Sequence, residues 1–123
     1  MQQPPTAADL LATVAEVLER EVVPALGGPV QHHARVAASV VAIVERELRL
    51  GPAAAERERT ALARLLGDDG SDLAALRHAL AARVRAGFAD DPTIEADVWD
   101  ELMRAARDDL SIAKPGHDAW DGD

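Results

Sequence analysis

The sequence of 123 residues contains no cysteine. Disulfide bonds, catalytic thiolates and cysteine-ligated zinc are therefore excluded, and the chain needs no oxidising compartment. Aromatic residues are scarce too, because the chain holds one Phe, two Trp and no Tyr. Phe88, Trp99 and Trp120 are scattered along it, so we expect no aromatic platform for stacking bases, flavins or sugars.

Positive charge is also in short supply. The chain has 13 Lys and Arg against 22 Asp and Glu, a formal net charge of -9. Such a chain repels phosphate backbones and anionic lipid surfaces, so we expect neither a nucleic-acid nor a membrane partner. The longest nearly apolar run, Val36 to Val44, is far shorter than a membrane span, and the first residues lack the pattern of a signal peptide. We therefore expect a cytoplasmic protein.

The abundant residues are Ala, Leu and Val, and the apolar ones recur at helical spacing. This pattern predicts five helices, over about residues 6–23, 30–50, 53–66, 71–87 and 91–113. No strand-type alternation appears. We predict an all-α fold, an antiparallel bundle of about five helices with short connections. Residues 1–113 would form one domain, followed by a disordered acidic tail over residues 114–123.

Capping and breaking residues set the predicted helix ends. Thr6 followed by Asp9 has the form of a capping box, and Asp91 before Pro92 repeats the start signal for the last helix. Gly51, as a left-handed cap, and Pro52 are expected to stop the second helix. Pro24 is expected to end the first helix, and Gly67 is expected to cap the end of the third. Ser71 is expected to be the N-cap of the fourth helix, and Gly87 is expected to end it.

Two polar residues interrupt the apolar faces of the first two helices. Glu21 falls on the apolar stripe of the first, and His33 falls on the wide apolar arc of the second. A loop of about six residues joins these helices antiparallel, which brings Glu21 and His33 to the same end of the bundle. One interpretation is a buried hydrogen-bonded pair that pins the hairpin. The other is a binding site, completed by Arg35, for a carboxylate or acyl thioester.

A metal site is a third reading, in which His32 joins Glu21 and His33. Adjacent helical residues point about 100° apart and rarely share one ion, so we predict no metal. The polar side of the second helix offers a different candidate, because Arg35, Ser39 and Arg46 form a stripe there. A small residue edged by arginines lets another helix approach, so this stripe is a candidate partner surface.

Several segments resemble a bacterial family of small helical proteins that has no assigned activity. The distinctive one is His33-Ala34-Arg35-Val36-Ala37, and the others are Pro5-Thr6-Ala7, Val23-Pro24-Ala25-Leu26-Gly27-Gly28, Ile43-Val44-Glu45-Arg46-Glu47-Leu48 and Leu110-Ser111-Ile112-Ala113-Lys114-Pro115. The resemblance covers nearly the whole chain. Genes of that family often lie beside those for acyl-CoA dehydrogenases and aminoglycoside-phosphotransferase-like kinases, which implies an accessory role in acyl-CoA metabolism.

Two hypotheses about function stay open. The first is an accessory or protein-interaction module that binds a neighbouring dehydrogenase or kinase, or a second copy of itself. The second is a small-molecule-binding or catalytic bundle that uses Glu21, His33 and Arg35. No nucleophile, oxyanion site or phosphate-binding loop accompanies these residues, so the sequence does not establish an enzyme and we expect no cofactor.

Overall fold

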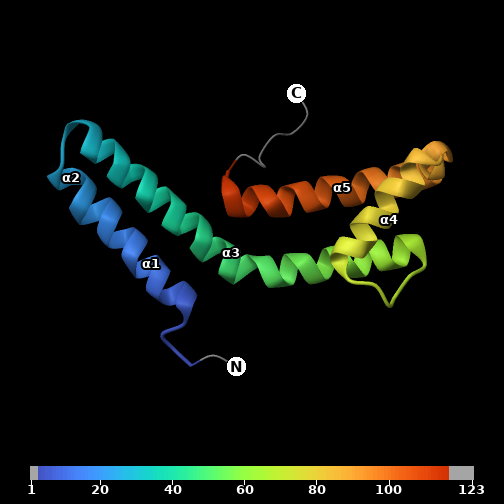
Figure 1. Cartoon of the computed structure of the whole chain (residues 1–123), viewed down its shortest axis with the longest axis horizontal. Helices are drawn as coiled ribbons and strands as arrows, with labels where there is room; N and C mark the ends of the chain where they lie inside the picture. The colour runs from blue at the N-terminus through green and yellow to red at the C-terminus, as the bar shows by residue number, and fades with distance from the viewer. Residues whose placement is uncertain (1–2, 117–123) are drawn as a thin grey trace. The chain divides into compact units, whose positions relative to one another are not determined.

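The computed structural model describes residues 3–116, and Figure 1 shows them as helices joined by turns. Four helices of this part exceed ten residues, namely α1 (Ala7–Val17), α3 (Gly28–Leu66), α4 (Leu73–Arg85) and α5 (Pro92–Ala113). The short elements are the π-helix η1 (Leu18–Val22), the single turn α2 (Val23–Ala25) and the 3₁₀ turn η2 (Phe88–Asp90). No strand occurs in residues 3–116, so the predicted all-α class is confirmed, with four long helices in place of five.

The first helical stretch begins as the sequence predicts. The Asp9 backbone N–H donates to Thr6 Oγ1 at 3.1 Å, and the Thr6 backbone N–H donates to Asp9 Oδ2 at 3.0 Å, which completes the capping box. The stretch ends later than expected, because η1 and α2 carry it past Pro24 to Ala25. Pro24 lies in the first turn of α2, where a missing backbone N–H is tolerated. Only Leu26 and Gly27 remain between α2 and α3, so the predicted six-residue loop is wrong.

The predicted stop at Gly51 and Pro52 is also wrong. Helix α3 runs without interruption through both residues, and Gly51 is not among the glycines with positive φ. A proline inside a helix removes one backbone hydrogen bond and strains one turn, at a cost of about 3 kcal/mol. Packing on both sides of the proline outweighs this cost, because the part before it lies along α1 and the part after it supplies Leu62 and Leu66 to a buried core.

The later boundaries follow local signals more closely. Gly67 has φ +68°, as its predicted role as a left-handed cap requires, and α5 spans the predicted Pro92–Ala113 with Asp91 as its N-cap. Helix α4 is capped by Asp72, whose side chain accepts from the Ala75 backbone N–H at 2.8 Å. The predicted cap, Ser71, instead donates its hydroxyl to the Asp68 carboxylate at 2.8 Å.

The chain divides into two compact units, residues 1–51 and residues 52–123. We call the first unit the hairpin, because α1 and the first part of α3 run antiparallel beside each other in it (Figure 1). The second unit contains the rest of α3, α4 and α5. No helix in residues 3–116 combines the length and the apolar character needed to cross a bilayer.

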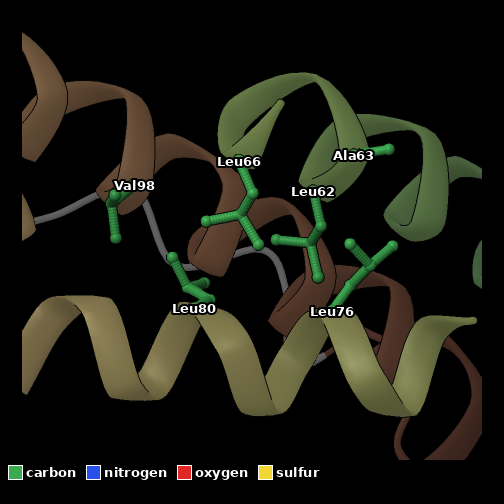
Figure 2. Packing of buried hydrophobic residues seen from close by; sticks show 6 residues of the cluster. All are labelled: Leu62, Ala63, Leu66, Leu76, Leu80 and Val98. Atoms are coloured by element: carbon green, nitrogen blue, oxygen red, sulfur yellow. The ribbon is translucent and has the colours of Figure 1, made fainter. Parts of the chain in front are cut away.

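A cluster of buried side chains forms the core of the second unit. Figure 2 shows Leu62 and Leu66 of α3 pointing toward Leu76 and Leu80 of α4. The complete cluster is Leu62, Ala63, Leu66, Leu76, Leu80 and Val98. Trp99 and Leu102 of α5 stay outside this core, because they are 63% and 51% exposed. Helix α5 buries only the stripe that contains Val98 and Ile112.

Candidate functional site

The hairpin has very little core of its own. Of the nine buried apolar residues in the described chain, only Val23 and Ala38 belong to it. The Gln31 side-chain amide donates to the Val23 carbonyl oxygen at 3.0 Å, which ties α3 to α2 beside the turn. Two helices that bury so little apolar surface are marginal by themselves.

Apolar side chains that are not buried are concentrated in the same unit. Eight of the eleven large exposed hydrophobic residues lie in the hairpin, each between 42% and 57% exposed. We call these eight residues the hairpin face; they are Leu10, Val14 and Val17 of α1 and Val30, Val36, Val40, Val44 and Leu48 of α3.

Both helices turn these residues to one side of the hairpin. Six of them stand directly before a partly buried residue in the sequence. The pairs are Leu10 with Leu11, Val14 with Ala15, Val17 with Leu18, Val30 with Gln31, Val40 with Val41 and Val44 with Glu45. One residue is a rotation of about 100° about the helix axis. Since the two helices run antiparallel, the same rotation in both places the two exposed stripes on the same side.

The structure brings Glu21 and His33 to the same end of this side, next to the turn. Glu21 directly precedes the partly buried Val22, and His33 directly precedes the partly buried Ala34. Most residues of the hairpin face have the same relation to a partly buried neighbour, so Glu21 and His33 lie on the same side of the hairpin as that face. The expectation that they are buried is wrong, because both are exposed, and no hydrogen bond or ion pair joins these two described residues. The sequence places them on the apolar side of each helix, but that side is uncovered in the chain.

Arg35 does not join them. It follows Ala34, whereas His33 precedes it, so the two side chains leave α3 in directions about 200° apart. Arg35 and Ser39 are exposed and Arg46 is partly buried, and all three lie on the side of α3 opposite the hairpin face. Arg35, Ser39 and Arg46 therefore lie together on one side of α3, whereas the predicted three-residue site of Glu21, His33 and Arg35 is split between two sides.

Neighbouring histidines give no evidence for a metal site. The rings of His32 and His33 have centroids 6.2 Å apart. Among residues 3–116, no group of three or more His, Asp or Glu side chains is arranged to hold a metal ion.

The second unit contains a groove that the sequence did not indicate. Its volume is about 470 Å³, and its apolar lining comes from all three helices, with Leu62, Leu80, Val84 and Leu102 prominent. At its edge Arg77 donates from Nε and Nη2 to the two carboxylate oxygens of Glu58, at 2.8 Å and 2.6 Å. This bidentate pair raises the pKa of Arg77. The only sequence signal is the helical repeat to which Val84 and Leu102 belong, and this repeat is the same for core residues and for residues that line a groove.

Residues 24–117, which are 94 of the 123, match the family described as a domain of unknown function, DUF6285. The chain belongs to the DUF6285 family. The match includes α3, α4 and α5, whereas α1 precedes it. No curated protein and no solved structure matches this DUF6285 chain.

Proposed function

We propose that this DUF6285 protein is a protein-interaction module whose hairpin face binds an apolar surface on another polypeptide. The supporting observation is the uneven burial of the chain: the hairpin has two buried apolar residues and eight half-exposed ones. Apolar patches of this extent on soluble proteins mark interaction sites, and a scatter of single exposed residues does not produce such a continuous stripe.

The energy available at this surface is sufficient for binding. Full burial of a Val or Leu side chain is worth about 1.5–3 kcal/mol. Each face residue is roughly half exposed, so covering it yields about 1 kcal/mol, and the eight together yield on the order of 8 kcal/mol. Burial of the facing partner surface adds a similar amount. Association costs about 4–15 kcal/mol, so a partner that matches this face can bind with a net gain.

The resemblance described above supplies the candidates for an accessory role. We propose that the protein acts in the cytoplasm beside an acyl-CoA dehydrogenase or a phosphotransferase-like kinase encoded next to it. The acidic charge of -9, most of which lies outside the hairpin, favours a partner with a basic surface. The stripe of Arg35, Ser39 and Arg46 offers a second contact surface on the opposite side of the hairpin.

The test is binding of the purified chain to the purified dehydrogenase and kinase, measured by calorimetry. V40E places a charge in the hairpin face, and S39E places the same charge at the adjacent residue, about 100° around α3 and within the stripe of Arg35, Ser39 and Arg46. We expect V40E to weaken binding at least 100-fold and S39E to change it less than threefold. Equal effects of the two variants, or no binding to either purified enzyme and no self-association, would remove the proposal.

The groove of the second unit supports a second candidate function, small-molecule binding. Its apolar lining fits an acyl chain, and Arg85 at its edge carries the charge that attracts a carboxylate. This keeps the predicted ligand class but moves the site away from Glu21, His33 and Arg35. Titration with octanoate, followed by amide NMR shifts, tests it. Shifts centred on Leu80 and Leu102 support the groove, and shifts centred on His33 support the original site.

A further inference from the structure

We propose that a second copy of this chain covers the hairpin face, so that two hairpins form a four-helix bundle around a two-fold axis parallel to the helices. This inference rests on the proposed function and names its first partner. Two-helix hairpins with one apolar side are the natural halves of such a bundle, and two-fold pairing of identical surfaces is the commonest form of oligomer.

Charge permits the hairpin to meet a copy of itself. Residues 1–51 contain four Arg and six Asp or Glu, so this unit carries only -2 of the total charge of -9. The remaining -7 belongs to residues 52–123. Self-association through the hairpin therefore brings together the least charged part of the chain. Apart from Glu21 and Glu47, the formal charges of the hairpin lie on helix sides other than that of the hairpin face.

The dimensions also suit an interface. The stripe of α3 from Val30 to Leu48 is 18 residues long, which is roughly 27 Å, and two helices side by side are roughly 20 Å wide. The projected footprint of the hairpin face is on the order of 500 Å². The accessible area is larger than this projection, because the protruding side chains make the surface uneven. Two such footprints together bury about 1,000 Å², which is the size at which biological interfaces begin and is smaller than the standard of about 800 Å² on each partner.

Glu21 and His33, at the turn end of the hairpin face, favour one of the two possible two-fold axes. With the axis parallel to the helices, α1 of one chain faces α3 of the other, and the two turns lie at the same end. Glu21 then faces the partner's His33, and Val14 faces the partner's Val40 and Val44. With the axis across the helices, Glu21 faces the partner's Leu10, which buries a carboxylate against an apolar side chain. With the parallel axis, two symmetry-related pairs form, each between Glu21 of one chain and His33 of the other.

The mass of the full chain in solution tests the dimer. Light scattering coupled to size exclusion is expected to give twice the protomer mass of 13.1 kDa. V40E is expected to shift the protein to the protomer mass while its helical circular dichroism is retained, and S39E is expected to leave the dimer intact. A wild-type chain that stays monomeric at 100 µM overturns the inference, and so does a V40E dimer as stable as the wild type.

The absence of cysteine allows a second test that reports the axis directly. Equimolar E21C and H33C chains, mixed and mildly oxidised, are expected to form a disulfide-linked heterodimer, whereas E21C mixed with L10C is not. The reverse pattern overturns the parallel axis, and so does the absence of any cross-link. A monomeric wild type that binds the dehydrogenase or kinase through a V40E-sensitive surface overturns the self-association alone and leaves the proposed function standing.

Discussion

Replacing Pro52 by Ala tests whether α3 is one continuous helix. Pro52 has no backbone N–H, so the Leu48 carbonyl four residues earlier lacks its helical donor. The substitution restores this hydrogen bond and removes the ring clash, a gain of about 3 kcal/mol in helix interiors. The unfolded chain regains freedom when a proline is lost, which returns about 0.4–1 kcal/mol. The expected net stabilisation is therefore about 2 kcal/mol.

This change is measured by thermal and urea unfolding followed by circular dichroism, at one fixed protein concentration. A stabilisation of about 2 kcal/mol corresponds to a rise in Tm of roughly 6–10 °C for a chain of this size. The matched control is Pro29→Ala. Pro29 is the second residue of α3, where the backbone N–H has no helical acceptor in any case. The control is therefore expected to lose up to about 1 kcal/mol through the unfolded state alone.

The two variants thus have opposite expected signs, and this makes the test sharp. A Pro52→Ala protein that is no more stable than the wild type, or that changes in the same direction as Pro29→Ala, would show that the chain breaks at Gly51 and Pro52 as its sequence suggests. Packing on both sides of the proline would then not outweigh the cost of the proline in the helix.

Three further changes address other parts of the chain. Leu76→Ala empties a site that is 0% exposed and should destabilise the second unit by about 3–5 kcal/mol in urea unfolding; a loss below about 1 kcal/mol would contradict the core. Thr6→Ala removes the capping box and should cost about 1 kcal/mol, seen as fraying of the first turn of α1 by NMR. Hydrogen bonds from the Ser71 hydroxyl and the Gly70 N–H lower the pKa of Asp68 below its usual 3.8, so its stabilising effect is present above that pH and is lost as pH falls through the lowered pKa. Ser71→Ala should raise the Asp68 pKa in a carboxyl NMR titration, and an unchanged pKa would rule out the hydroxyl as the main cause.

Features that depend on neighbouring residues alone could be predicted from the sequence. The capping box of Thr6 and Asp9 and the start at Asp91 and Pro92 are satisfied within four residues, so no distant contact can override them. Pro52 is different, because its outcome depends on packing by segments far along the chain. A single sequence shows the penalty of the proline but not the contacts that outweigh it.

The candidate site shows the same division. The helical period put Glu21 and His33 on the apolar sides of their helices and at one end of the hairpin, and the structure agrees with both placements. It did not show whether those sides are covered, because an amphipathic pattern looks the same for a core and for an interface. The groove of the second unit was missed for the same reason, since Val84 and Leu102 repeat like core residues but remain exposed.

The small core of the hairpin makes the stability of this unit depend on concentration. A unit that needs cover from outside has a stability set by mass action, so it depends on the concentration of whatever covers it. Each tenfold dilution of that partner removes about 1.4 kcal/mol of the stabilisation once the partner is well above its dissociation constant. The second unit, with its own core, has no such dependence. The concentration of that partner therefore sets the stability of the hairpin, whereas the stability of the second unit depends on its own core.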